Sequence, residues 1–370
     1  MNEALRVIFA GGGTGGHLFP AIAIAEALLQ LRPDTAVRFV GSGNRIEARV
    51  VPAQGYAFDP LWISGLRRSF SLSTVVLPLK LLVSLMQSWR ILRRRRPHVV
   101  VGTGGFASGP LIYVAARIGI RALIHEQNEH PGVTTRRLAS LVDEVHVTFP
   151  SSARLLPGAR RIVVSGNPVR PSLQRHDPGD ARVHFGLHPA RRTLFVFGGS
   201  LGASAINRAL RPLVPRLVRE EYQLIWQTGA RDIEEFRSLG ALYQEQVVVR
   251  PFIDEMDQAY SAADLVLCRA GATSVAELGV LAIPAILVPY PHAAADHQDK
   301  NAVAVAARGA ARVLRDSELS RLETELFSLL DDEKELARMT AAAAALGRPR
   351  AAVDIAEAVI RLAERQEETK

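Results

Sequence analysis

Residues 6–17 read R-V-I-F-A-G-G-G-T-G-G-H, an apolar run followed by a loop of glycines, one threonine and a histidine. The apolar run predicts a buried β-strand, and Gly11, Gly13 and Gly16 satisfy the G-x-G-x-x-G pattern of a strand–turn–helix unit. Glycine allows close backbone approach, and a helix N-terminus offers unpaired N–H groups to phosphate or sugar oxygens. We expect the helix to begin near Pro20. This stretch predicts a parallel α/β sheet with a ligand site after its first strand.

Apolar runs alternate with helical patterns along all 370 residues, which is typical of α/β proteins with parallel sheets. A second glycine turn, Gly198–Ala203, follows an apolar run in the second half. We therefore predict two Rossmann-like domains facing each other across a cleft, with a helical tail from about residue 318. The predicted strands are Arg6–Ala10, Val37–Gly41, Val99–Gly102, Ala122–His125, Glu144–Val147, Leu194–Gly198, Tyr222–Gln227, Val247–Pro251, Leu265–Cys268 and Ala285–Val288.

The domain boundary is expected in a stretch between residues 165 and 190, where proline and glycine oppose regular structure. We assign residues 1–165 to the first domain and residues 166–349 to the second. The chain contains one cysteine, Cys268, which excludes an internal disulfide framework and fits a reducing compartment.

The formal charge of +8 is compatible with nucleic acid, anionic lipid or a phosphorylated ligand, or with a surface where arginine replaces lysine. Residues 61–96 are distinctive, because Lys80 is the only charge between Ser69 and Trp89 and four arginines end the segment. Pro78 and Lys80 argue against a membrane span. We interpret the segment as an amphipathic surface that meets an anionic membrane, or alternatively as a helix packed on its own sheet. No nucleic-acid partner is predicted.

Polar residues with catalytic potential follow two of the apolar strands. His17 follows the first glycine loop, where an imidazole can accept a proton from an attacking hydroxyl or can simply cap the helix. H-E-Q-N at residues 125–128 ends a strongly apolar strand, and buried polar groups there need hydrogen bonds or a ligand. We interpret Glu126 and Asn128 as ligand contacts, and Glu126 and His125 remain alternatives to His17 as the base.

The second half contains a candidate nucleotide site where a strand runs into a helix. Gly271 and the small residues after it expose N–H groups suited to a diphosphate, and Thr273 and Ser274 add hydroxyl donors. Glu277, one turn further on, either accepts ribose hydroxyls or complements the helix dipole.

Two further residues are candidates for contacts with the ligand. Arg170 offers a planar fork to phosphate, and Gln298 lies in a polar loop that either binds sugar hydroxyls or is a solvated connector.

Motifs for metals and for common cofactors are missing from the sequence. It contains no D-x-D triplet, H-E-x-x-H motif or C-x-x-C pair, so we predict no bound metal and no cofactor. A nicotinamide cofactor would need an acidic residue after the second strand, but residues 40–45 read V-G-S-G-N-R. This favours a transferase over a nicotinamide oxidoreductase.

Eight motifs occur in a fixed order along essentially the whole chain. They are G-G-T-G-G-H at 12–17, G-T-G-G-F-A-S-G-P at 102–110, H-E-Q-N at 125–128, G-N-P-V-R at 166–170, G-G-S-L-G-A at 198–203, F-I-D-E-M at 252–256, R-A-G-A-T-S-V-A-E at 269–277 and H-Q-x-x-N-A at 297–302. This set resembles the MurG family of glycosyltransferases, within glycosyltransferase family 28. The chain departs from the family at Thr135 and Arg136, where members often carry N-K, and at Ser204, where an arginine is expected.

The resemblance implies a GT-B fold in which a C-terminal helix, at about residues 350–370, crosses back to the first domain. It implies inverting transfer of GlcNAc from UDP-GlcNAc to the C4 hydroxyl of MurNAc in lipid I, which forms lipid II for peptidoglycan. The acceptor would bind the first domain and the donor mainly the second. The enzyme would lie peripherally on the cytoplasmic face of the cell membrane, with cell-wall synthesis proteins as possible partners. A relative with another lipid acceptor and a non-catalytic nucleotide-sugar-binding subunit are the alternatives.

The resemblance also assigns roles to individual residues. His17 and Glu126 are the expected catalytic residues, Ile253 would contact uracil through its backbone, and Glu277 would bind the ribose. The expected UDP-GlcNAc contacts are Thr14, Gly15, Gly16, Asn128, Arg170, Ser200, Ile253, Ala272, Thr273, Ser274, Val275, Ala276, Glu277 and Gln298.

Overall fold

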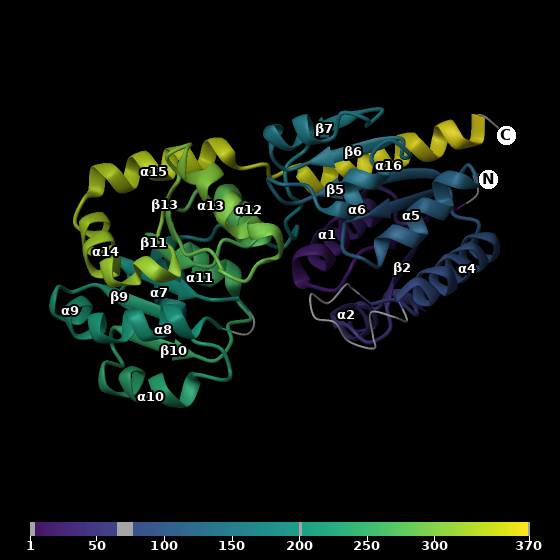
Figure 1. Cartoon of the computed structure of the whole chain (residues 1–370). Helices are drawn as coiled ribbons and strands as arrows, with labels where there is room; N and C mark the ends of the chain where they lie inside the picture. The colour runs from purple at the N-terminus through teal and green to yellow at the C-terminus, as the bar shows by residue number, and fades with distance from the viewer. Residues whose placement is uncertain (1–3, 65–76, 200–201, 369–370) are drawn as a thin grey trace. The chain divides into compact units, whose positions relative to one another are not determined.

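The chain forms two compact units, each built around its own parallel sheet. The structure is a computed structural model that describes residues 4–64, 77–199 and 202–368 (Figure 1). The first unit comprises Met1–Pro171 together with Arg348–Lys370, and the second comprises Ser172–Gly347. The predicted boundaries, after residues 165 and 349, differ from these by only a few residues.

The first unit contains a seven-stranded parallel sheet with the strand order β3-β2-β1-β4-β5-β6-β7. Its strands are β1 (Arg6–Ala10), β2 (Ala36–Ser42), β3 (Ala57–Leu61), β4 (Val99–Gly102), β5 (Arg121–Glu126), β6 (Glu144–Val147) and β7 (Ile162–Val164). Its helices are α1 (Gly15–Leu31), α2 (Ile46–Ala53), α4 (Leu77–Arg95), α5 (Ser108–Arg117), α6 (Val133–Leu138), η1 (Pro150–Leu155) and α16 (Ala351–Glu368). The strand order reverses at β1, so the loops after β1 and β4 meet at one edge of the sheet.

The residues of β1 show how both faces of this sheet are buried. Val7 and Phe9 belong to one apolar cluster with residues of α1 and α16, whereas Ile8 and Ala10 belong to another with residues of α4 and α5. Successive strand residues point to opposite faces, so an uninterrupted apolar strand needs helices on both sides. The C-terminal helix α16 is part of the first unit and packs on α1 (Figure 1), which confirms the predicted return of the chain.

The second unit contains a six-stranded parallel sheet with the strand order β10-β9-β8-β11-β12-β13. Its strands are β8 (Thr193–Phe197), β9 (Gln223–Gln227), β10 (Val247–Arg250), β11 (Leu265–Cys268), β12 (Ala285–Leu287) and β13 (Ala311–Val313). Its helices are α7 (Pro178–His184), α8 (Ser204–Leu210), η2 (Arg211–Leu213), α9 (Val214–Arg219), α10 (Ile233–Leu242), α11 (Met256–Ala262), α12 (Ala272–Val280), η3 (Ala294–Asp296), α13 (His297–Ala306), η4 (Asp316–Arg321), α14 (Leu322–Leu330) and α15 (Glu333–Leu346). The order reverses at β8, so the ends of β8 and β11 form the corresponding edge.

Two expectations about helices were wrong. The first glycine loop leads directly into α1 at Gly15, and Pro20 lies one turn inside the helix rather than at its start. The stretch between residues 165 and 190 contains α7, which has Pro178 in its first turn and Asp177 as its N-cap. The Asp177 carboxylate accepts hydrogen bonds from Gly179 N and Asp180 N, so proline here starts a helix instead of preventing one.

The loops after β1 and β4 approach so closely that glycine is required. Thr103 N donates a hydrogen bond to Ala10 O over 2.9 Å. A Cβ atom added to Gly105 would lie 2.3 Å from the carbonyl oxygen of Gly12, and Gly105 has a φ of +78°. Both the close contact and the left-handed backbone exclude a side chain.

We predict that Gly105→Ala destabilises the protein far more than Gly119→Ala. Both glycines have a φ of +78°, but nothing lies within 4 Å of a Cβ atom at Gly119. Gly119→Ala should cost about 1–2 kcal/mol for the left-handed conformation alone. Gly105→Ala should cost several kcal/mol more, because the loop must move away from Gly12. Urea unfolding of both variants checks this, and equal losses of stability would contradict the close packing of the two loops.

Candidate active site

The first glycine loop is closed by a carboxylate of the protein itself. Glu47 is fully buried, and its carboxylate oxygens accept hydrogen bonds from Gly13 N and Ser42 N, each over 2.9 Å. A Cβ atom at Gly12 would lie 2.3 Å from the Glu47 carboxyl carbon. A carboxylate in this position occupies the Gly13 amide and repels a second anion. Sequence reasoning missed Glu47, and its only signal is a glutamate in the first turn of a helix after Gly41-Ser42-Gly43.

The helix after this loop presents His17 in its first turn. Thr14 is the N-cap of α1 and makes no side-chain capping bond, and Gly15 and Gly16 are the first two helical residues. Thr103 Oγ1 donates to the carbonyl oxygen of His17 over 2.7 Å, which ties this turn to the loop after β4. The half-buried imidazole packs so closely on Gly104 that a Cβ atom there would lie 2.8 Å from His17 Nδ1.

The imidazole of His17 also makes a specific side-chain hydrogen bond. His17 Nδ1 lies 3.0 Å from Gln127 Oε1, which follows β5. The structure thus places the side chain against the glycine loop after β4 and pairs one of its nitrogens with a buried amide, rather than using it as a helix cap.

His125 is a poor candidate for a general base. Its side chain is fully buried and its Nε2 lies 3.0 Å from the carbonyl oxygen of Gly166. Burial lowers the pKa of His125 to about 3, against an opposing effect of the Gly166 hydrogen bond. The imidazole therefore stays neutral at physiological pH, with both nitrogens inside the protein.

Glu126 is surrounded by hydrogen-bond donors from its own loop. Its carboxylate accepts from Gly132 N at 2.9 Å, Thr135 Oγ1 at 2.6 Å, Asn128 N at 3.2 Å and Asn128 Nδ2 at 3.3 Å. These four hydrogen bonds tie the carboxylate to the loop that follows β5. This geometry favours an anchor for the loop 127–135 over the catalytic role predicted for Glu126. Thr135, where the chain departs from its family, supplies the shortest of these bonds.

Arg170 belongs to the first unit and lies in a half-buried position. Burial raises the pKa of Glu26 in α1, and the positive charge of Arg170 opposes part of this rise. The positive charge of Arg170 therefore acts on a side chain of α1 beyond its first turn.

In the second unit, Gln227 connects the glycine turn after β8 to the chain after β10. Gln227 Nε2 donates to Gly199 O over 3.1 Å, and its Oε1 accepts from Ile253 N over 2.9 Å. The backbone N–H of Ile253 is therefore already engaged in a hydrogen bond within the protein. Ser200, a predicted donor contact, lies outside the described residues. Sequence reasoning missed Gln227, although a polar residue at the end of a buried apolar strand is a signal of the kind used for residues 125–128.

Helix α12 has the features of an anion site at its N-terminus. It starts at Ala272 after the N-cap Gly271, which makes no side-chain capping bond. Thr273 Oγ1 is buried and has no hydrogen-bond partner among the described residues. This arrangement suits a phosphate group, because the helix N-terminus supplies N–H donors and a positive field and the Thr273 hydroxyl supplies a further donor.

Glu277 lies on the same helix and is held by a buried tyrosine. Tyr260 of α11 donates its hydroxyl hydrogen to Glu277 Oε2 over 2.8 Å. Both side chains are buried, and Tyr260 packs edge-on against Phe195 and Phe197. The tyrosine, which sequence reasoning missed, fixes one carboxylate oxygen of Glu277.

Gln298 follows a strained turn. Ala295 and Asp296 both have left-handed backbones, with φ of 53° and 54°, which is unfavourable for residues other than glycine. Gln298 Oε1 accepts a hydrogen bond from Tyr290 N over 3.0 Å, which ties the side chain to the chain after β12. Strain of this kind is concentrated at functional loops.

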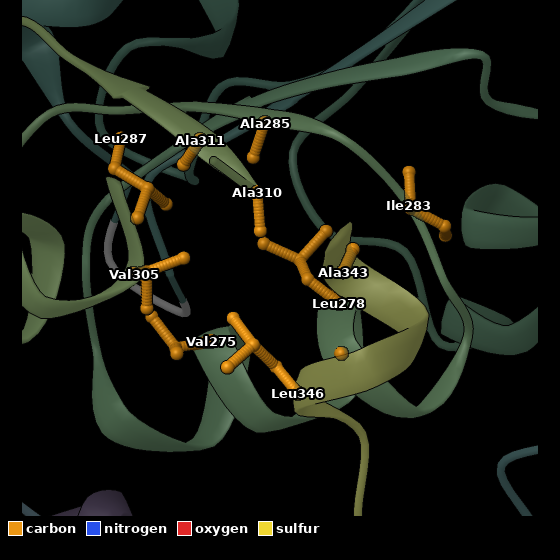
Figure 2. Close-up of a pocket in the computed structure, with 11 residues that line it drawn as sticks. Val275, Leu278, Ile283, Ala285, Leu287, Val305, Ala310, Ala311, Ala343 and Leu346 are labelled. Atoms are coloured by element: carbon orange, nitrogen blue, oxygen red, sulfur yellow. The ribbon is translucent and has the colours of Figure 1, made fainter. Parts of the chain in front are cut away.

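A small apolar cavity of about 10 Å³ lies beneath α12 (Figure 2). The side chains of Val275 and Leu278 point into it. The cavity holds at most one water-sized molecule and is therefore a packing defect rather than a ligand site. Its lining residues are Val275, Leu278, Gly279, Ile283, Ala285, Leu287, Val305, Ala310, Ala311, Ala343 and Leu346.

Helix α4 of the first unit exposes a row of large apolar side chains, here called the α4 stripe: Leu79, Leu82, Met86 and Trp89. Their spacing of three and four residues puts them on one helix face, and the exposed Arg93 continues it. Ser84, Ser88 and Leu92 are buried on the other face. Within residues 4–64, 77–199 and 202–368, no helix is long and apolar enough to span a membrane.

Comparisons with known proteins agree with this architecture. The glycosyltransferase family 28 N-terminal domain matches residues 7–147, and the family 28 C-terminal domain matches residues 193–355. Proteins named UDP-N-acetylglucosamine–N-acetylmuramyl-(pentapeptide) pyrophosphoryl-undecaprenol N-acetylglucosamine transferase are similar over nearly the whole chain. The one from Salinibacter ruber is 44% identical over 98% of both chains. The one from Moorella thermoacetica is 41% identical over 97% of this chain and 100% of its own.

Solved structures of glycosyltransferases share this fold. The crystal structure of Acinetobacter baumannii MurG has a TM-score of 0.75 at 29% identity and covers 96% of this chain and 99% of its own. A kitacinnamycin glycosyltransferase has a TM-score of 0.71 at 15% identity, over 97% of this chain and 99% of its own, which supports the fold alone.

We predict that His125 makes the protein less stable in mild acid. The pKa of His125 is about 3 in the folded chain and 6.5 when unperturbed, so between these values only the unfolded chain binds the proton. Stability from this group is complete above pH 6.5 and falls as the pH drops, by about 2 kcal/mol at pH 5. His125→Asn should remove this part of the loss between pH 7.5 and 5, measured by urea unfolding. The exposed His184→Asn is the matched control, and identical pH dependence of the His125 variant and wild type would contradict the prediction.

Proposed function

Because the chain belongs to glycosyltransferase family 28, we propose that it transfers GlcNAc from UDP-GlcNAc to the C4 hydroxyl of MurNAc in lipid I. The product would be lipid II, with inversion at the anomeric carbon, for use in peptidoglycan synthesis. Similarity over nearly the full length to transferases of that name supports this choice of substrates. The observation that carries the proposal is the presentation of His17 at the ligand edge of the first sheet.

In the proposed reaction, the C4 oxygen of the acceptor attacks the anomeric carbon of GlcNAc. The bond from that carbon to the diphosphate breaks, and its electron pair leaves with UDP. The acceptor hydroxyl proton goes to Nε2 of His17, because Nδ1 is engaged with Gln127 Oε1. Glu126 would hold the loop around residues 127–135 in shape for the acceptor instead of moving a proton.

The second unit would bind most of UDP. The N-terminus of α12, residues Ala272 to Ala276, would hold the diphosphate and stabilise the leaving charge, with the unpartnered Thr273 hydroxyl donating a hydrogen bond. The Glu277 carboxylate would accept the ribose hydroxyls while Tyr260 holds it. Since the Ile253 amide is used by Gln227, uracil would meet the Ile253 carbonyl oxygen. No metal is proposed. The sequence contains no D-x-D triplet, and the positive field of the α12 N-terminus would stabilise the diphosphate charge instead.

Other predicted contacts remain part of this proposal. Gln298 would bind sugar hydroxyls through its side-chain amide nitrogen, since its oxygen accepts from Tyr290 N. Ser200 would add a hydroxyl from the turn after β8. The proposed donor contacts from the first unit are Thr14, Gly15, Gly16, Asn128 and Arg170.

We predict that His17→Ala abolishes most turnover but keeps the donor site. With radiolabelled UDP-GlcNAc and a short-chain lipid I analogue, the wild type should form the labelled disaccharide product with or without chelator. His17→Ala should lower kcat by about 10²–10⁴-fold, as expected for the loss of a general base, with little change in UDP-GlcNAc affinity by calorimetry. His184→Ala, on the exposed surface of α7, is the matched control.

Each arm of this experiment can fail separately. Absence of any labelled disaccharide would overturn the acceptor assignment, and loss of activity in chelator would overturn the metal-free reaction. Full turnover by His17→Ala would remove His17 as the base. Donor binding without turnover in the wild type would instead favour a nucleotide-sugar-binding subunit.

We further propose that the α4 stripe holds the enzyme on the cytoplasmic face of the membrane, where cell-wall synthesis proteins also work. The stripe exposes Leu79, Leu82, Met86 and Trp89, and Arg93 to Arg96 follow at the end of the helix. Apolar side chains would enter the lipid interface while the guanidinium groups meet anionic headgroups. This surface belongs to the segment predicted at residues 61–96, of which residues 65–76 lie outside the described residues.

We predict that Leu82→Ser together with Met86→Ser reduces binding to vesicles that contain phosphatidylglycerol by about tenfold, since two apolar side chains that would enter the lipid are lost. Activity on a soluble short-chain acceptor should remain. Leu242→Ser, which removes an equally exposed leucine from α10, is the control and should bind vesicles like the wild type. Unchanged sedimentation of the double variant with vesicles would remove the α4 stripe as the membrane contact.

A further inference from the structure

A chain of hydrogen bonds leads from a backbone carbonyl to His17. It begins at Gly166 O, which lies 3.0 Å from His125 Nε2. A carbonyl oxygen can only accept, so His125 Nε2 must carry the hydrogen. His125 is neutral, because burial lowers its pKa to about 3. Its other nitrogen, Nδ1, therefore carries no hydrogen and can only accept.

The unprotonated Nδ1 of His125 fixes the orientation of the Gln127 side-chain amide. Gln127 Nε2 lies 3.1 Å from His125 Nδ1 and 2.7 Å from Thr103 O, and both of these atoms are acceptors. If the amide were reversed, Gln127 Oε1 would face two acceptors without a hydrogen between them, which is strongly unfavourable in a buried site. The amide NH2 group must face inwards, and Oε1 must face His17.

The orientation of Gln127 in turn decides which nitrogen of His17 is protonated. Gln127 Oε1 lies 3.0 Å from His17 Nδ1 and can only accept, so Nδ1 must be the donor. In the neutral imidazole the lone pair then resides on Nε2. The ring has little freedom to turn, because its Nδ1 packs against Gly104 and its Cδ2 faces Gly105.

We propose that Gln127 is a positioning residue that locks His17 in the tautomer with its lone pair on Nε2. This inference rests on the proposed function, in which Nε2 receives the proton of the acceptor hydroxyl. In the opposite tautomer, Nε2 would present a hydrogen to that hydroxyl and could not accept its proton. After proton transfer the imidazolium keeps its Nδ1 hydrogen, and the bond to Gln127 Oε1 becomes charge-assisted.

An amide performs this task differently from the carboxylate that orients histidine in many hydrolases. Gln127 is buried and uncharged, so it fixes the tautomer without placing a negative charge beside the base. Its direction is set by Thr103 O and His125 rather than by solvent. The fixed tautomer therefore depends on the folded backbone at Thr103 and Gly166.

The test compares two substitutions of Gln127, one that removes the hydrogen-bond acceptor opposite His17 Nδ1 and one that keeps it. Gln127→Met keeps the size of the side chain but removes the acceptor opposite His17 Nδ1. Gln127→Glu keeps an acceptor there, and its protonated form can still donate to Thr103 O. Gln223→Met is the matched control, because Gln223 is an equally buried glutamine that accepts from His188 N and donates to His188 O in the second unit.

The primary measurement is the ¹⁵N NMR signature of His17 in protein labelled at histidine, assigned by the signal missing in His17→Ala. In the wild type, Gln127→Glu and Gln223→Met, the spectrum should show a protonated Nδ1 and an unprotonated Nε2. Gln127→Met should show a mixture of tautomers. Its kcat should fall by about 10²-fold with KM for UDP-GlcNAc within about threefold, while Gln127→Glu recovers most of the turnover.

An unchanged His17 tautomer in Gln127→Met would overturn the proposal. So would a loss of turnover in Gln223→Met as large as in Gln127→Met, since the effect would then be one of general stability. The NMR result does not depend on catalysis. A locked tautomer combined with full turnover in His17→Ala would therefore reject the proposed base while leaving the role of Gln127 in place.

Discussion

The close approach of the backbone after β1 to the backbone after β4 is the constraint on which the first half-site depends. These strands are neighbours where the sheet order reverses, and Gly12 and Gly105 meet there at a distance that excludes any side chain. The contact brings the first turn of α1 against the loop after β4. Thr103 can then bind the His17 carbonyl with its side chain and the Gln127 amide with its own carbonyl.

The strand-to-helix turn after β1 and the one after β11 differ in the groups that surround their backbone N–H groups. In the first unit, the buried carboxylate of Glu47 accepts a hydrogen bond from Gly13 N and fills the space beside Gly12. In the second unit, α12 begins without a side-chain cap and offers the unpartnered hydroxyl of Thr273. The Glu47 carboxylate therefore disfavours an anion beside Gly13, whereas the N-terminus of α12 favours one.

Much of the fold was predictable from sequence because buried parallel strands are continuous apolar runs. The ten predicted strands are all present, with ends within one residue, whereas β3, β7 and β13 were missed. All three are edge strands, short or partly polar, and so lack that signal. His17 and Glu277 were recognisable from local motifs. Glu47 and Tyr260 were missed because only the folded topology brings them to Gly13 and Glu277, whereas Gln227 was missed although it ends a buried apolar strand.

The ability of His17 to accept a proton depends on where the hydrogens lie between Gly166 and His17, and neutron diffraction from a perdeuterated crystal observes them directly. We expect deuterium on His125 Nε2, on the Gln127 nitrogen towards Thr103 O and on His17 Nδ1, with none on His17 Nε2 at a pH where the imidazole is neutral. Deuterium on His17 Nε2 together with a bare Nδ1 would contradict the account, because the imidazole could not then receive a proton from an attacking hydroxyl.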